Sequence, residues 1–207
     1  MDTKALRQKI LDLAIRGKLV PQDPNDEPAS VLLERIRAEK QQMVKDGKLK
    51  PKDIKNDTLI FVGEDNLHYE KFQDGTVKCI EDEIPFEVPE GWGWCRLASI
   101  CSLISDIDHK MPKAVDDGVL FLSAKDLLND GTINYTDDVK MISEEDFFRL
   151  SKKALPQKND IIYSRIGACL GKARVVTKDI RFIVSYSCCT IRPVIIDSTF
   201  LASILDG

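Results

Sequence analysis

The chain has 207 residues, of which 43% are hydrophobic and 31% charged, and a formal net charge of −4 at pH 7. These values are typical of a soluble globular protein with one or two domains. No apolar stretch approaches the roughly 20 residues that a membrane-spanning helix needs. The first residues also lack a signal-peptide core, so we expect a cytoplasmic protein without a membrane association.

Residues 1–56 predict a helical hairpin followed by a linker. Their apolar positions recur at the three- and four-residue spacing of two amphipathic helices: Leu6, Ile10, Leu13, Ala14, Leu32, Leu33, Ile36 and Met43. Gly17 is expected to end the first helix, while Pro28 and Gly47 bound the second. Two antiparallel helices cannot cover both apolar stripes, so we expect them to bind another helix, from this protein or from a partner. The predicted partner-binding side chains are Leu6, Ile10, Leu13, Leu33, Ile36 and Met43.

Residues 57–91 are acidic and predict a β-hairpin with an extended lead-in to the next domain. They include a strong turn signal at Asp74-Gly75 between two strand-like runs. The prolines near their end exclude a helix. Trp92 and Trp94 follow, and on one face of a strand they would anchor the lead-in by burial. The alternative for these two side chains is stacking on single-stranded nucleic acid.

Residues 92–207 predict a β-rich domain with a few helices. Short apolar runs recur between turn residues, and a helix is expected over residues 143–155, where Ser143 precedes three acidic residues. The last residues, FLASILDG, have the pattern of a helix that is opening, which indicates a domain that is incomplete at its C-terminus. Together with the N-terminal part, the predicted class is α+β.

Basic residues gather in one part of this domain. Between Arg149 and Arg181 there are nine basic and two acidic side chains, a local charge of +7 in an acidic protein. Within this window, two strand-like runs flank a glycine-containing loop that carries Arg165 and Lys172. Such a concentration of positive charge indicates a phosphate-rich partner. The alternative is a solvated lysine-rich face.

Sequence motifs of common catalytic sites are absent. Neither a nucleotide-binding glycine motif nor a zinc-protease or nucleophile-elbow motif occurs. The two histidines, His68 and His109, have no metal-ligand neighbours at helical spacing, and the six cysteines form no CxxC pair, so we expect mainly buried reduced thiols. No catalytic residue, metal or cofactor is therefore predicted.

Several segments together resemble the specificity subunit of type I restriction-modification systems. LRQKILDLAIRGKLVPQDPNDEPASVLLERIRAEK is similar to the conserved-region helices of that family, and IFVGEDNLHYEKFQDGTVKCIEDEIPFEVPEGWGWCRL to the lead-in of many members. GVLFLSAKDL, DHKMPK and NDIIYSRIGACLGKARVV resemble parts of a target-recognition domain. The resemblance covers nearly all of the chain, and the order of the motifs makes it specific.

The resemblance implies a division of labour between subunits. A target-recognition domain of this family reads half of a split DNA sequence through major-groove contacts and phosphate contacts. The conserved helices act as a spacer and dock the modification subunits, which bind S-adenosylmethionine and transfer the methyl group. Cleavage belongs to a restriction subunit that joins through them. We therefore expect a non-catalytic DNA-specificity subunit with residues 1–56 as helical region, 57–91 as lead-in and 92–207 as an incomplete recognition domain.

Two features depart from the family pattern. Ile107 stands in a loop where members usually have glycine, and members normally carry two recognition domains, whereas this chain ends inside the first. The second departure keeps another hypothesis open: a degenerate specificity half-subunit that docks a methyltransferase, or a second copy of itself, through its helices without reading DNA.

The candidate DNA contacts are basic residues of loops in the third segment: Lys110, Lys113, Lys125, Arg165 and Lys172. Arg165 is the first candidate for a base or bidentate phosphate contact, because guanidinium groups pair with guanine in the major groove. For each lysine, a solvated surface charge is the alternative.

Overall fold

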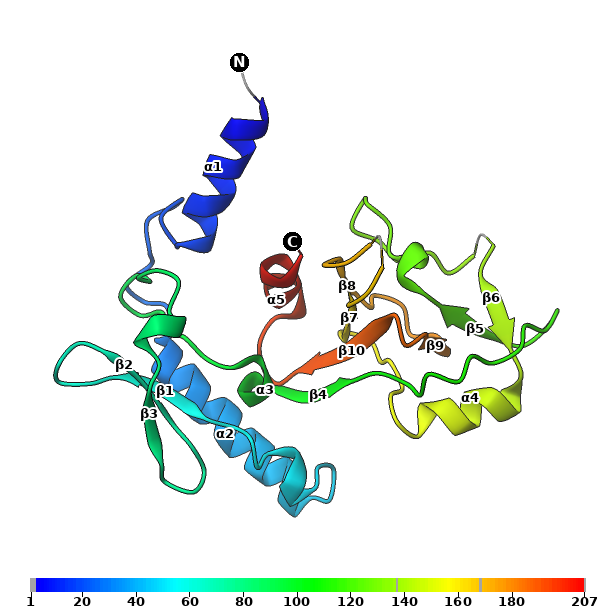
Figure 1. Cartoon of the computed structure of the whole chain (residues 1–207), viewed down its shortest axis with the longest axis horizontal. Helices are drawn as coiled ribbons and strands as arrows, with labels where there is room; N and C mark the ends of the chain where they lie inside the picture. Colours follow the sequence, from blue (N-terminus) through cyan, green and yellow to red (C-terminus); the bar gives the residue numbers. More distant parts are fainter. Residues whose placement is uncertain (1–2, 137, 168, 207) are drawn as a thin grey trace. The chain divides into compact units, whose positions relative to one another are not determined.

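A computed structural model describes residues 3–136, 138–167 and 169–206, except the side chain of Ile15 (Figure 1). By spatial contacts the chain separates into two compact units, Met1–Ile100 and Cys101–Gly207. The described residues form five α-helices and ten strands in three sheets, which confirms the predicted α+β class. No helix of this part of the chain has the length and apolar character needed to cross a membrane.

The first unit begins with two helices, α1 (Thr3–Ile15) and α2 (Ala29–Lys45), at the predicted positions. They do not pack along each other as the predicted hairpin (Figure 1); α2 packs against the short helix α3 (Leu97–Ile100). The residues between them instead contact the end of the lead-in and the tryptophan after it: Trp92 Nε1 donates a hydrogen bond of 2.7 Å to Gln22 Oε1, and the Ala29 N–H donates one of 2.7 Å to the Gly91 carbonyl. Contacts with the lead-in thus replace the expected helix–helix contact.

A three-stranded antiparallel sheet follows α2 in the first unit. Its strands, in the order β1-β2-β3, are β1 (Leu59–Val62), β2 (His68–Lys71) and β3 (Val77–Cys79). Gly75 adopts φ +86° in the predicted turn between β2 and β3, a conformation that suits glycine. Short 3-10 turns occupy Pro51–Asp53 before the sheet and Glu81–Glu83 after it. The predicted hairpin is therefore part of a three-stranded meander.

A buried ion pair links α2 to the residues around it. Lys40 is 1% exposed, and its Nζ lies 2.7 Å from Asp57 Oδ2. The same ammonium donates hydrogen bonds of 2.8 Å to the Ala98 carbonyl and 3.4 Å to the Ser99 carbonyl. A buried ammonium needs hydrogen-bond acceptors for its donors. Lys40 finds them in two other segments, and it thereby links α2 to Asp57 and to α3.

Trp92 and Trp94 lie in irregular extended backbone and not in a strand. Trp94 packs edge-on against Phe86 with 5.1 Å between ring centroids, whereas Trp92 remains 38% exposed. Because Trp94 has the greater packing role, we expect Trp94→Ala to lower the free energy of unfolding of the first unit by up to about 3 kcal/mol, and Trp92→Ala by less. Thermal unfolding followed by circular dichroism measures both, and loss of DNA binding without loss of stability would contradict the anchoring role.

Glu70 on β2 gives the first unit an acid-sensitive contact. Arg96 donates hydrogen bonds to both of its carboxylate oxygens, at 3.0 and 2.6 Å, and they lower the pKa of Glu70 below its usual 4.5. A carboxylate with a lowered folded-state pKa stabilises the fold above the unfolded pKa, and this contribution is lost as the pH falls through the folded pKa. We expect Glu70→Gln to flatten the acid dependence of the unfolding midpoint below about pH 4.5. Parallel pH curves for the two proteins would contradict this.

The second unit contains two sheets. The four-stranded antiparallel sheet has the order β4-β10-β7-β8, and the three-stranded sheet has the order β6-β5-β9, with β5 and β9 parallel. The strands are β4 (Cys101–Ser105), β5 (Val119–Leu122), β6 (Lys140–Ile142), β7 (Ile161–Ser164), β8 (Ala173–Val175), β9 (Phe182–Val184) and β10 (Cys188–Pro193). The turn η3 (Ala124–Asp126) follows β5, and α5 (Ser198–Leu205) follows β10.

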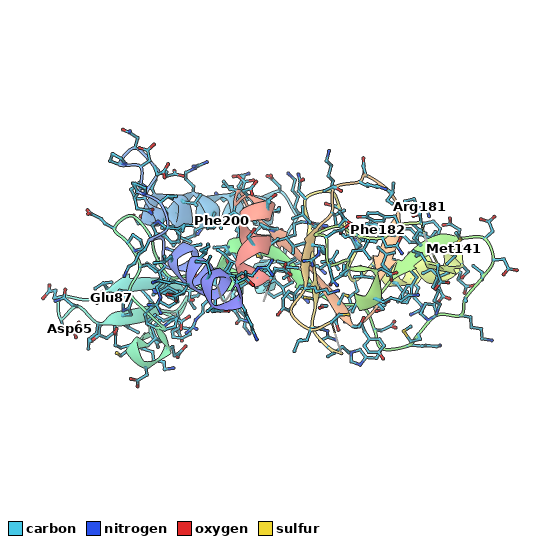
Figure 2. All side chains as sticks on the ribbon, turned by 90° about the horizontal axis from the view of Figure 1, so that it is seen from above. Asp65, Glu87, Met141, Arg181, Phe182 and Phe200 are labelled. Atoms are coloured by element: carbon cyan, nitrogen blue, oxygen red, sulfur yellow. The ribbon has the colours of Figure 1, made fainter. Side chains whose placement is uncertain are left out.

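The small sheet has an apolar cluster on each face, because side chains alternate along its strands. Leu122 and Phe182 belong to one cluster, with Ile162 of the larger sheet, whereas Phe121 and Ile183 belong to the other. Helix α4 (Glu144–Ser151) covers the second cluster with Phe147 and Leu150. Phe182 is fully buried, while its neighbour Arg181 is exposed (Figure 2).

Helix α4 begins where the sequence predicts and ends four residues earlier than expected. Ser143 caps it by accepting a hydrogen bond of 3.2 Å from the Asp146 N–H. Its C-cap is Lys152, and Ala154 is buried in the second cluster beyond the helix end. Pro156 excludes a helix that continues to Leu155, since a proline biases the residue before it away from helix.

Candidate nucleic-acid interface

The β7–β8 hairpin carries Arg165 and Lys172 at the two ends of its turn. β7 ends at Ser164, whose carbonyl accepts the Gly171 N–H at 3.0 Å. Gly167 and Gly171 have φ angles of +91° and +92°, so both positions need the conformational freedom of glycine. The predicted pair of strands joined by a glycine-containing loop is confirmed.

The guanidinium of Arg165 is held by two other loops. Its Nε donates a hydrogen bond of 2.9 Å to the Tyr186 carbonyl, and its Nη2 forms an ion pair with Asp106. Burial opposes ionisation of Asp106, but Lys153 and Arg165 outweigh it and lower the pKa of this carboxyl below 3.8. The side chain of Arg165 remains 37% exposed, so a partly fixed guanidinium is accessible to a ligand.

His109 lies beside this arginine on the loop that follows β4. Its ring packs on Tyr186 with 4.9 Å between centroids, and its Nε2 is 3.4 Å from Arg165 Nη2 and 3.7 Å from Asp106 Oδ2. Ile107 of the same loop is fully buried against Val119 and the other residues of the second cluster. The residue that departs from the family pattern therefore anchors the loop to the core.

Ser187 joins two of the candidate loops. Its carbonyl accepts the Arg165 N–H at 3.0 Å, and its Oγ accepts the Ala124 N–H at 3.3 Å. Ala124 begins the turn η3, which carries Lys125. Lys172 Nζ donates a hydrogen bond of 2.8 Å to the Leu127 carbonyl, just after this turn. The hairpin turn and η3 are therefore neighbouring loops.

The five candidate DNA contacts differ in their ion pairing and in their location. Lys110 and Lys113 are exposed and have no ion pair among the described residues, and Lys110 directly follows His109. Lys125 Nζ contacts Asp138, at 3.4 Å from its Oδ2. Lys113 lies instead beside β6, where Lys140 Nζ donates a hydrogen bond to the carbonyl of the neighbouring Pro112. The structure brings the loops of Arg165, Lys172, Lys125 and Lys110 together and leaves Lys113 outside this set.

Much of the positive charge between Arg149 and Arg181 is neutralised within the second unit. Five of the nine basic side chains form ion pairs with carboxylates outside this window: Arg149, Lys153, Arg165, Arg174 and Arg181. Arg174 is 5% exposed and belongs to the fold. The window thus offers fewer free cations than its sequence indicates.

The arrangement is suited to binding a ligand through hydrogen bonds and charge. Within the described ranges, no three His, Cys, Asp or Glu side chains are placed to hold a metal ion. Cys188, the cysteine nearest the Ser187 loop, has its pKa raised to about 12 by burial, which keeps the thiol protonated and unreactive.

Sequence reasoning missed the residues that position Arg165. Asp106, Tyr186 and Ser187 lie 20 or more residues from it, so local patterns carry no signal for them. Tyr186 and Ser187 belong to IVSYSCCTIRPV, one of the short apolar runs expected as strands, whereas the structure places both residues between β9 and β10. The pairing of β7 with β10 places Ser164 opposite Cys188, and this register brings Ser187 next to Arg165.

The two units define an α+β protein with basic loops on a packed β-rich scaffold. No family model matches the chain. It is similar to the type I restriction enzyme EcoAI specificity subunit of Escherichia coli, with 39% identity over 164 residues, which are 77% of this chain and 23% of that protein. It is also similar to the type I restriction enzyme EcoEI specificity subunit of Escherichia coli, with 47% identity over 105 residues, 51% of this chain and 14% of that protein.

These two relatives confirm the resemblance inferred from the sequence: over part of its length, the chain is homologous to type I restriction enzyme specificity subunits. The aligned part is less than a quarter of either relative.

Proposed function

We propose that this chain contributes sequence-specific DNA recognition to a type I restriction-modification complex and has no catalytic site of its own. The observation that carries the proposal is the 39% identity to a specificity subunit over 77% of the chain. In such a complex, methyl transfer and cleavage belong to other subunits. The setting is the cytoplasm, where these complexes meet double-stranded DNA.

The proposed DNA surface is formed by the loops that meet at Ser187. Arg165 is held by a backbone carbonyl and by Asp106 before any ligand binds, and a preorganised arginine loses little side-chain entropy on binding. Lys110 offers phosphates an ammonium group that has no ion pair among the described residues, and Lys113 offers another from outside this set of loops. Lys125 and Lys172 can replace their contacts with backbone carbonyls by contacts with phosphates. Phosphate contacts would position the domain, and Arg165 would read a base of one half of a split target.

The helices of the first unit are the proposed docking site for the modification subunit and, through it, the restriction subunit. Leu6 and Ile10 of α1 are 45% and 44% exposed, and Leu13 is half-buried. Exposed apolar residues at helical spacing are typical of a helix-binding surface. Leu33 and Met43 are half-buried, and Ile36 is buried in the first unit, so α1 offers the more accessible part of this surface.

A second candidate is a protein-interaction module that docks a methyltransferase or a second copy of itself without reading DNA. The observation that favours it is the internal pairing of five of the nine basic residues between Arg149 and Arg181.

Salt-dependent binding to mixed-sequence duplex DNA separates the two candidates. If four or five cations contact phosphates, the slope of log K against log salt should be about −4, since each contact contributes about −0.9. Fluorescence anisotropy of a labelled duplex from 50 to 200 mM salt measures this slope. A DNA-reading domain gives the steep slope, and a pure interaction module gives no measurable binding.

A further inference from the structure

Strand β1 of the first unit has an open edge. It pairs with β2 on one side only, and it is the first strand in the order β1-β2-β3. The Leu67 carbonyl accepts the Gly63 N–H at 2.8 Å, so Gly63 faces β2. The N–H and C=O groups of successive residues point to alternate sides of a strand. The backbone groups of Phe61 therefore also point to β2, while those of Ile60 and Val62 point away from the sheet. Within the described chain, these outward groups have no hydrogen-bond partner.

Ser99 covers the outer edge of the chain at Thr58, just before β1, and the open edge begins after this residue. Thr58, the preceding outward-facing residue, donates its N–H to Ser99 Oγ at 2.9 Å, and its carbonyl accepts the same hydroxyl at 3.2 Å. One side chain thus satisfies the backbone of Thr58. An unpaired edge is usually shielded, because it can pair with another strand.

A cavity of about 710 Å³ adjoins β1. All four residues of β1 line it, together with residues of α2 and of the segment from Glu87 to Cys95. Its apolar walls include Leu33, Val88, Pro89 and Trp92. An extended peptide could therefore use both the backbone edge and apolar side-chain pockets, as in binding by strand addition.

An unpaired donor lies in the wall of the same cavity. Trp94 lines it, and its indole N–H is buried without a hydrogen-bond partner in the described part of the chain. Buried indole groups normally find an acceptor, and a backbone carbonyl of an added strand would supply one.

The rim of the cavity carries excess negative charge. Glu34, Glu87 and Glu90 line it, are exposed and form no ion pair within the described residues; Glu87 is labelled in Figure 2. Arg37 is the opposing exposed cation of the lining. Residues 57–90 as a whole carry ten acidic and two basic side chains. This charge repels nucleic acid and the same acidic edge of a second copy, and it attracts a cationic segment.

We propose that the open edge of β1 binds an extended, cationic segment of a partner protein, which adds as a fourth strand beside Ile60 and Val62. Apolar side chains of the segment would enter the cavity, and its lysine or arginine side chains would face Glu34, Glu87 and Glu90. This site is distinct from the DNA-binding loops and does not depend on them.

Synthetic heptapeptides test this proposal on the full chain. The probe alternates valine with lysine; one control replaces its lysines by glutamates, and another replaces its valines by glycines. We expect the valine–lysine peptide to bind at least tenfold more tightly than either control, and to slow hydrogen exchange at the Ile60 and Val62 amides. Equal binding of the lysine and glutamate peptides, or no binding of the probe, would overturn the proposal.

A pair of proline variants locates the binding edge. Val62→Pro removes an outward N–H from β1, and Val77→Pro removes one from β3, the opposite edge of the same sheet; the two valines are 56% and 51% exposed. Proline is tolerated at such edge positions, and thermal unfolding checks that both variants fold. Val62→Pro should weaken peptide binding at least tenfold and Val77→Pro should leave it unchanged. Similar binding by the two variants would overturn the assignment to β1.

Discussion

Replacing Lys40 by methionine should lower the free energy of unfolding of the first unit by roughly 3–5 kcal/mol. The substitution leaves the carboxylate of Asp57, whose side chain is 12% exposed, without its partner at 2.7 Å. Burial already raises the pKa of Asp57 above 3.8 even with Lys40 present. An unpaired carboxylate in this position must either stay desolvated or take up a proton, and both destabilise the fold at neutral pH.

Tryptophan fluorescence measures this loss selectively, because the two tryptophans of the sequence, Trp92 and Trp94, both lie in the first unit. Lys45→Met is the matched control, since Lys45 is an exposed residue of α2 and its replacement should change stability by less than about 0.5 kcal/mol. Adding Asp57→Leu to Lys40→Met should recover most of the loss. A loss below about 1 kcal/mol in Lys40→Met would show that the pair is not buried in solution.

Replacing Arg165 by alanine should weaken binding to the preferred duplex by roughly 1–3 kcal/mol, about 5- to 150-fold. The guanidinium is fixed by the Tyr186 carbonyl and by Asp106, and it remains partly exposed at the end of β7. Arg165→Lys should restore the salt dependence of binding but not the preference for one sequence, because a lysine cannot reproduce the planar, bidentate contact.

Lys158 supplies the control for Arg165. It precedes β7, whereas Arg165 follows it, so the two cations stand at opposite ends of one strand. Lys158→Ala should leave the affinity within about twofold if the DNA surface lies at the Ser187 end. Equal losses in the Arg165 and Lys158 variants, measured by fluorescence anisotropy at one salt concentration, would contradict the placement of the interface.

The elements of the fold follow from local sequence patterns, whereas their packing does not. Helix α2 was predicted from its apolar spacing, and the turn at Gly75 from Asp74-Gly75. Lys40 occupies the same stripe as Leu33, Ile36 and Met43, yet its burial depends on Asp57, 17 residues away in sequence. The helical hairpin was expected from two apolar stripes, but periodicity alone does not choose between a neighbouring helix and the lead-in as the packing partner.

At the candidate site, too, the sequence predicts the local turn but not the contacts with residues that are distant in sequence. The glycine-containing turn with Arg165 and Lys172 was predicted correctly, because strand runs and glycines are local signals. The neutralisation of its basic surroundings was not predicted, since Asp106, Asp108, Glu144 and Asp206 reach it from other segments. A charge count along the sequence cannot distinguish a free cation from one that is paired across the fold.

Selection of bound sequences from a random duplex library tests the central claim of sequence-specific DNA recognition most directly. The purified chain is mixed with the library at physiological salt, and the bound duplexes are sequenced over successive rounds. We predict enrichment of one short motif by the wild-type chain and by Lys158→Ala, and loss of that enrichment in Arg165→Ala. Binding that enriches no motif, or a motif that survives in Arg165→Ala, would contradict recognition through the loops that meet at Ser187.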